Sequence, residues 1–188
     1  QGYELVSKDE LPAKFDLDSS HDQNVTVHLK HGTTDIQEHK QVSLTVRYHG
    51  AGSQTPANNV QTATWTRTVT KDKVTGDVVK TTDWVADKAT YNAVPSPAIP
   101  GYTVDVATVP AETVTQEDMV KDVHYSIQTQ KVTYTVIDDT THTTLKDKVE
   151  LTTGNSGANL PAAAQTKYDT AVADYLAQGY ELVSKDEL

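Results

Sequence analysis

The sequence contains no cysteine among its 188 residues. Disulfides, thiolate metal sites and cysteine nucleophiles are therefore excluded. Long apolar runs are also absent: the longest, such as residues 132–137 (VTYTVI), fall far short of the roughly 20 residues that span a bilayer. We expect no insertion into a membrane.

Clustered positive charge is missing as well. The chain carries 16 Lys and Arg against 26 Asp and Glu, for a net charge of -10 and a pI near 5.0. Phosphate groups are bound by grouped cations, and the cations here are scattered. The composition argues against nucleic acid and anionic membrane surfaces as partners.

Enzyme signatures are absent from the sequence. There is no G-x-S-x-G, no HExxH and no glycine-rich phosphate loop. We predict that the chain is not an enzyme and requires no cofactor.

The most informative feature that is present is a repeated segment. Residues 1–11 and 178–188 both read QGYELVSKDEL, which sets a period of 177 residues, from residue 1 to residue 178. Self-similarity at a fixed period is typical of repeat architectures, so we expect one period of a tandem array plus a short overlap. The KDEL at residues 185–188 also stands at residues 8–11, and we interpret it as interior sequence rather than a retention signal.

A fainter repeat lies within this period. GYELV at residues 2–6 and GYTVDV at 101–106 are each followed by a proline, acidic residues and an alternating run, at 24–29 and 122–127. The period therefore contains two related modules.

Period-2 alternation of Val, Ile, Thr and Tyr, as at residues 43–48 and 132–137, predicts half-buried strands. Residues 62–69 and 78–84 flank KDKVTGD, in which Gly76 can adopt a positive φ. This pattern predicts a long β-hairpin.

Apolar residues recur at helical spacing in residues 160–178, with Asn159 as the expected N-cap, Pro161 in the first turn and Gly179 as the C-terminal stop. A second, short helix is expected within residues 85–94, before a proline cluster. The residues that carry the first pattern are Tyr168, Ala171, Val172, Tyr175 and Leu176.

The order strand, strand, helix, strand, strand is that of a β-grasp fold. We therefore predict an α+β protein of two β-grasp modules in an elongated tandem arrangement, one of them split between the chain ends. Residues 1–32 are the expected closing half of one module, 36–129 a complete hairpin-bearing module, and 131–188 the opening part of the next.

In such a fold the first and last strands run parallel, so a module begins and ends at opposite poles. We therefore expect the fragments 1–32 and 131–188 to complete each other between molecules, head to tail. Closure within one chain is the alternative.

The spaced motifs KVTYTVIDD, KVELTTGNSG, GYELV and NVTVHLKHG resemble the mucin-binding (MucBP) module, and residues 41–128 resemble its longer, hairpin-bearing companion. The whole period is similar to one repeat of the mucus-binding (Mub-type) surface adhesins of lactic acid bacteria. The resemblance implies ubiquitin-like β-grasp modules in an extracellular, cell-wall-anchored, Gram-positive surface protein that binds mucin glycoproteins. Similarity of that fold to bacterial immunoglobulin-binding domains implies immunoglobulins as a further partner.

The loop DLDSSHD at residues 16–22 places its carboxylates at alternate positions, like the first ligands of a calcium loop. His21 stands where that loop needs glycine and Val27 where it needs glutamate, so a solvated acidic turn is the competing interpretation. The candidate calcium ligands are Asp16, Asp18 and Asp22.

The seven histidines show no paired zinc-binding spacing. Their unperturbed pKa of about 6.5 means that all of them gain charge below about pH 5, which moves the net charge from -10 toward -3. Because mucins carry sialate and sulfate, we expect mucin binding to strengthen on acidification.

The aromatic residues Trp65, Trp84, Tyr91 and Tyr102 are candidates for stacking on sugars, with core packing as the competing interpretation. The sequence does not name a ligand-binding residue. It leaves two functions open, a weak binding module that gains avidity by repetition and a non-binding stalk or spacer.

Overall fold

The computed structural model describes all of residues 1–188, which form mainly β-strands and a single α-helix. This confirms the α+β class. The chain divides into two compact units, each described by itself below. Unit 1 comprises residues 1–45, 60–93 and 110–120, and unit 2 comprises 46–59, 94–109 and 121–188. The helix is not long and apolar enough to cross a membrane.

Unit 1 consists of strands that pair locally. β4 and β5 form the predicted long hairpin, with Val69 opposite Thr81, and Gly76 in the turn has φ +80°. The strands of this unit are β1 (Tyr3–Lys8), β2 (Val27–His31), most of β3 (Thr33–His49) and of β4 (Asn59–Asp72), β5 (Val78–Thr81), β6 (Val85–Ala86), β7 (Thr90–Tyr91) and β11 (Glu112–Thr113).

The core of unit 1 is built by alternation along β3, because successive side chains of a strand point to opposite faces. Val42 and Leu44 are buried, and the residues between and beside them are not. The remaining buried members of this cluster are Ala63, Tyr91 and Val114, with Trp65, Ala86 and Met119 packed against them.

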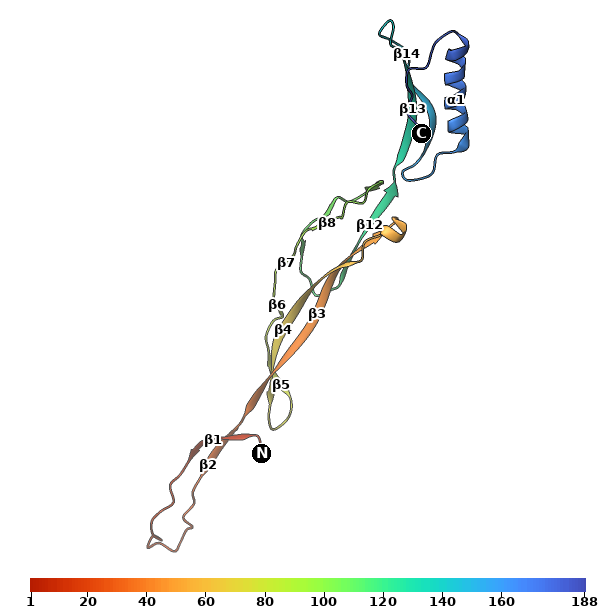
Figure 1. The fold of residues 1–188 in the computed structure, drawn as a ribbon. Coiled ribbons are helices and arrows are strands. Elements are labelled where there is room, and N and C mark those ends of the chain that lie inside the picture. The colour runs from red at the N-terminus through yellow and green to blue at the C-terminus, as the bar shows by residue number, and fades with distance from the viewer. The chain divides into compact units, whose positions relative to one another are not determined.

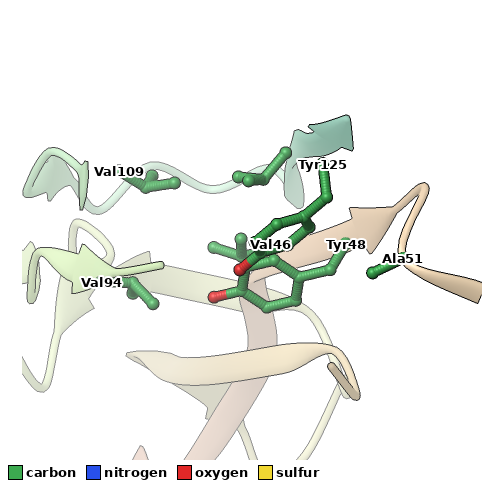
Figure 2. Close-up of a cluster of buried hydrophobic side chains, with 7 residues drawn as sticks. Val46, Tyr48, Ala51, Val94, Val109 and Tyr125 are labelled. Carbon is green, nitrogen blue, oxygen red and sulfur yellow. The ribbon is translucent and has the colours of Figure 1, made fainter. Parts of the chain in front are cut away.

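Unit 2 has a second small core, shown in Figure 2. Val46 and Tyr48 of β3 enter it, and the Tyr48 and Tyr125 rings lie side by side with their centroids 6.3 Å apart. The Tyr125 hydroxyl donates a hydrogen bond to the Pro97 carbonyl oxygen at 2.6 Å, so this buried phenol is satisfied. The other buried members are Ala51, Val94, Val109 and Val123.

The elements of unit 2 beyond this core include a two-stranded sheet, β13–β14, with α1 lying along it (Figure 1). The bounds of the unit's elements are η1 (Gly52–Gln54), β8 (Val94–Pro95), β9 (Tyr102–Val104), β10 (Thr108–Val109), most of β12 (Met119–Ile127), β13 (Thr129–Asp138), β14 (Thr143–Asn155) and α1 (Ala162–Ala177).

The long helix is confirmed, and its C-terminus is stopped by Gly179 as predicted. Gly179 has φ +97°, its N–H donates to the Leu176 carbonyl, and the N–H of Tyr180 donates to the Tyr175 carbonyl. This is a Schellman motif, and the accompanying apolar contact is the edge-on packing of Tyr180 on Tyr175 at 5.6 Å.

The predicted N-cap was wrong. Pro161, in extended conformation, is the N-cap residue, and neither it nor Asn159 makes a side-chain cap hydrogen bond. The helix begins at Ala162, two residues later than an N-cap at Asn159 would place it, because a residue that precedes a proline disfavours the helical region, which keeps Leu160 out of the first turn.

The predicted short helix within residues 85–94 was also wrong. This segment forms the short strands β6, β7 and β8, which pair with β4, β11 and β10. Tyr91 and Val94 each point into a core from these strands, so tertiary pairing and burial decided the local conformation.

The largest sheet has the order β5-β4-β3-β12-β9, with β6 also on β4. The predicted β-grasp order required a helix within residues 36–129, and this segment contains no α-helix, so the structure does not confirm that order here.

The duplicated segment has two conformations. Residues 3–8 form β1, which pairs antiparallel with β2, whereas residues 180–185, with the same sequence, have no regular secondary structure. The same six-residue sequence therefore has different structural surroundings at the two positions.

Gly50 provides a test of how closely the backbone packs in unit 2. A Cβ at this position would lie 2.2 Å from the Tyr125 carbonyl oxygen, and Gly50 has φ +96°. Gly76 has φ +80° but nothing within 4 Å of such a Cβ. We expect Gly76→Ala to lower the free energy of unfolding by about 1–2 kcal/mol through backbone strain alone, and Gly50→Ala to lower it distinctly more. Denaturant titration followed by circular dichroism measures both, and equal costs would contradict the close approach.

Candidate functional site

The four aromatic residues that the sequence singled out have different surroundings. Tyr91 is fully buried, and Trp65 is half-buried and donates its indole N–H to the Thr115 carbonyl at 2.8 Å. Trp84 lies beneath the Arg67 guanidinium, 4.7 Å from the ring centroid. Tyr102 borders a hollow of the surface.

This hollow, which we call the glutamine hollow, has a volume of about 600 Å³ in unit 2. Backbone hydrogen bonds hold its wall: the Gln128 N–H donates to the Gly101 carbonyl at 2.7 Å, and the Ser156 N–H donates to the Gln128 carbonyl at 2.8 Å. Its lining residues are Gln54, Pro100, Gly101, Tyr102, Gln128, Gln130, Ser156 and Gly157.

The chemistry of the glutamine hollow suits a hydroxyl-rich ligand. None of its lining residues carries a charge, and three are glutamines with both donor and acceptor atoms. Tyr102 lines the hollow and also packs against the core of unit 2. The Ser156 Oγ is buried and has no hydrogen-bond partner in the structure. A sugar presents an apolar face for an aromatic ring and hydroxyls for amides, which matches this set.

Sequence reasoning missed the three glutamines and Ser156. Gln54 lies in η1, Gln128 between β12 and β13, Gln130 in β13 and Ser156 directly after β14, so no single sequence motif links all four. Gly101-Tyr102 was the one available signal, because the Gly-Tyr motif marked this position.

A second hollow, which we call the helix groove, lies between α1 and β13–β14 and has a volume of about 390 Å³. The Lys167 ammonium donates to the Glu150 carbonyl at 2.6 Å, and Lys131 lies 2.9 Å from the Glu150 carboxylate. Hydrogen bonding from Lys131, and then from Thr153, lowers the pKa of Glu150. The groove is lined by Tyr134, Lys146, Lys167, Thr170, Ala171, Asp174, Tyr175 and Gln178.

Four of the seven histidines, His21, His31, His49 and His124, lie beside carboxylates. Asp122 accepts hydrogen bonds from Arg47 at 3.0 and 3.2 Å and lies 2.8 Å from His49. His49 stacks on His124, with ring centroids 5.0 Å apart, and His124 lies 3.3 Å from Asp105. No group of three or more His, Cys, Asp or Glu side chains anywhere in residues 1–188 could hold a metal ion.

Hydrogen bonds lower the pKa values of several aspartates. Arg47, followed by His49, lowers the pKa of Asp122. In unit 1, His31 lies 2.6 Å from Asp72 and is the largest cause of its lowered pKa. These carboxylates stay ionised under conditions that begin to protonate ordinary ones.

In the predicted calcium loop two carboxylates accept hydrogen bonds from backbone N–H groups of the same loop. Asp16 accepts from the Asp18 N–H at 3.1 Å, and Asp18 accepts from the Ser20 N–H at 2.9 Å. Hydrogen bonding from Ser20 is the main cause of the lowered pKa of Asp18, and His21 lies 3.2 Å from that carboxylate. Asp22 does not join them in a three-carboxylate cluster. These contacts make an acidic turn, and calcium binding by this loop stays a prediction.

The lowered pKa of Asp122 predicts acid sensitivity. Because its folded-state pKa lies below the unfolded value of about 3.9, its stabilising effect is fully present above that value and is lost as the pH falls through the folded pKa. We expect Asp122→Asn to lower the melting temperature at pH 7, and the difference from the parent chain to shrink at pH 3.

Asp139→Asn, an exposed carboxylate of the same unit, serves as the control and should give a small difference that changes less with pH. Thermal melts at both pH values measure these differences. If the melting temperature of Asp122→Asn lies as far below that of the parent chain at pH 3 as at pH 7, the stabilising role of ionised Asp122 is contradicted.

Comparison with known families accounts for most of the chain. The family model of the Muc B2-like domain matches residues 33–137, and that of the mucin binding domain matches residues 1–31 and 130–188. No curated protein gives a significant match.

Several solved structures are similar to this chain. The crystal structure of Mub-RV is 35% identical, covers 68% of this chain and 76% of its own, and has a TM-score of 0.55. The type 2 repeat of the mucus binding protein MUB from Lactobacillus reuteri is 32% identical over the same shares of the two chains, with a TM-score of 0.41. The mucin-binding domain of Spr1345 from Streptococcus pneumoniae is 28% identical and covers 50% of this chain and 97% of its own, with a TM-score of 0.45. This chain therefore belongs to the Muc B2-like domain family and is a MucBP-type repeat.

Proposed function

We propose that this chain is a repeat of a bacterial cell-surface adhesin that holds mucin glycoproteins through weak contacts multiplied along an array. The observation that carries the proposal is the match of both family models, which together extend over the chain from residue 1 to residue 188. A surface adhesin acts outside the cell, so we propose an extracellular location with wall anchoring through the parent protein.

The glutamine hollow is the proposed contact for the mucin glycan. Its neutral lining supports sugar hydroxyls rather than a charged group, and the Tyr102 ring supports the apolar face of a pyranose. Each hydrogen bond from an amide contributes about 1 kcal/mol, so a single shallow site binds weakly. Repetition along an array converts weak sites into useful avidity without any new contact.

Holding rather than converting the ligand fits the geometry. The carboxylates with perturbed pKa values pair with histidines, arginine, lysine and backbone N–H groups, and none of them lines the glutamine hollow. A general acid and base must lie within hydrogen-bond reach of the reacting atoms. We therefore propose a binding module and no reaction at this site.

Glutamine substitutions test the contact surface. We expect the double variant Gln54→Ala/Gln130→Ala to weaken binding to immobilised mucin by about thirtyfold, since two neutral hydrogen bonds of about 1 kcal/mol each are lost. Gln116→Ala, an exposed glutamine of unit 1, is the matched control and should bind like the parent chain. Biosensor measurements with the single chain and with a tandem of several copies, competed by free mucin glycans, measure the effect.

The outcomes of this experiment distinguish a binding module from a non-binding stalk, the two functions that the sequence leaves open. Binding by the tandem but not by the single chain indicates weak multivalent sites, whereas no binding by either favours the stalk. If the double variant binds as well as the parent, the glutamine hollow is not the contact. The same biosensor measurement with antibody fragments tests the expectation that the chain binds immunoglobulins.

The charge of the chain predicts a pH dependence. Sialate and sulfate on mucin repel a chain of net charge -10, and the net charge of the chain becomes less negative on acidification. We expect mucin binding to strengthen between pH 7 and pH 5 at constant ionic strength. The increase should be smaller on desialylated, desulfated mucin, and a flat profile on native mucin would contradict the electrostatic argument.

A further inference from the structure

The first two Gly-Tyr motifs of the chain occupy the same place in their pairs of strands. Tyr3 begins β1 and lies opposite His31, the last residue of β2. Tyr102 begins β9 and lies opposite Ile127, the last residue of β12. Both pairs are antiparallel. Each motif therefore lies beside the end of a strand, one in unit 1 and one in unit 2.

A single residue links each of these strand ends to the strand that follows. Gly32 lies between β2 and β3, and Gln128 lies between β12 and β13. The Gly32 N–H donates to the Gly2 carbonyl at 2.8 Å. The Gln128 N–H donates to the Gly101 carbonyl at 2.7 Å. In both units the linking residue is thus bound to the glycine of a Gly-Tyr motif.

The carbonyl of the linking residue is bound as well. Lys73, directly after β4, donates its N–H to the Gly32 carbonyl at 2.9 Å. Ser156, directly after β14, donates its N–H to the Gln128 carbonyl at 2.8 Å. We call these two backbone hydrogen bonds around one linking residue the clasp. Because both polar groups of its backbone are paired, the linking residue cannot rotate without breaking a hydrogen bond.

Glycine is required where the clasp closes. Gly2 has φ +87° and Gly101 has φ +82°, a region that other residues rarely adopt. A Cβ on Gly2 would lie 2.6 Å from the Lys73 carbonyl oxygen. A Cβ on Gly101 would lie 3.1 Å from the Ser156 Cβ. Each glycine therefore lies close against the residue that donates the second hydrogen bond of its clasp.

The side chains around the two clasps are different. Beside the first clasp, His31 lies 2.6 Å from the Asp72 carboxylate, whose side chain is only 13% exposed. The second clasp forms the wall of the uncharged glutamine hollow. The linking residues, glycine and glutamine, also differ. What the two clasps share is the glycine and the backbone geometry, so the arrangement does not depend on a particular set of side chains.

The boundaries of the family matches fall at the clasps. The mucin binding domain model matches residues 1–31 and 130–188, and the Muc B2-like model begins at residue 33. Gly32 lies between two matches, and Gln128 lies two residues before the match that starts at residue 130. Domain boundaries usually fall in exposed, flexible linkers that few contacts cross. Here the linker is one residue with both backbone groups bound.

We propose that the clasp is the joint between successive modules of the array, and that it holds the direction of each module fixed relative to the module before it. Fixed joints keep the binding sites of an array at a constant spacing, which raises the effective concentration of the second site for a ligand that matches this spacing. This consequence rests on the proposed function, whereas the joint itself does not.

Hydrogen exchange of backbone amides, followed by NMR on the full chain, tests one clasp against the other. We expect slow exchange at Gly32 and Gln128 in the parent chain, because both amides are hydrogen-bonded. Gly101→Val should speed exchange at Gln128 by about fivefold or more, the loss of one neutral hydrogen bond, and leave Gly32 unchanged. Gly2→Val should do the reverse. Gly52→Val, at φ +57° with nothing within 4 Å of a Cβ, is the control and should change neither amide.

The absence of native cysteine allows a measurement of how firmly the second clasp holds. Spin labels at Asn58→Cys and Asp139→Cys lie on the two sides of the clasp along the chain, and labels at Asp139→Cys and Ala177→Cys lie on one side. Pulsed electron paramagnetic resonance should give a narrow distance distribution for the first pair. In Ser156→Pro, which removes an N–H of the clasp and leaves Gly101 in place, this distribution should be about twice as wide or wider. The second pair should keep its width.

Two results would overturn the proposal. One is a distance distribution for the first label pair that is as wide in the parent chain as in Ser156→Pro. The other is exchange of the Gln128 amide at the rate of an unstructured peptide. If circular dichroism shows that Gly101→Val unfolds the chain, Ser156→Pro decides the matter. None of these measurements involves mucin, so their failure is distinct from failure of the proposed binding.

Discussion

The alternation of side chains along β3 is the constraint on which both cores depend. Val42 and Leu44 enter the core of unit 1, and Val46 and Tyr48 enter that of unit 2, all at even positions of one strand. A shift of one residue in the pairing of β3 would turn all four outward. Only fifteen side chains are buried in the chain, twelve of them aliphatic and three of them tyrosines, so these four are a large share of the interior.

Small cores explain why so much of the chain depends on local pairing. The short strands β7 and β8 each contribute one buried residue, Tyr91 and Val94, and are held by pairs of only two residues. Outside the cores, carboxylates are satisfied by histidine, arginine and backbone N–H groups at the surface, where such pairs contribute modestly to stability. The same surface, acidic and scattered with histidines, gives the pH dependence proposed for binding.

The sequence predicted correctly those elements that depend on residues close together in the chain. The helix and its Gly179 stop follow from spacing and from a positive φ that glycine adopts easily, and the β4–β5 hairpin follows from alternation around Gly76. The N-cap at Asn159 and the helix within residues 85–94 were wrong because the proline at 161 and the burial of Tyr91 outweighed weak propensities. The glutamine hollow could not be predicted, since Gln54, Gln128 and Ser156 are brought together only by the fold.

The duplicated segment shows that an identical local sequence can have two conformations, so that tertiary structure decides between them. By itself the sequence determined the repeat, the strand pattern, the helix with its stop and the family. Whether QGYELVSKDEL forms a strand was decided only by tertiary structure, because a strand needs a partner for its backbone hydrogen bonds. Residues 3–8 pair with β2, whereas residues 180–185 follow α1 and pair with no strand among residues 1–188.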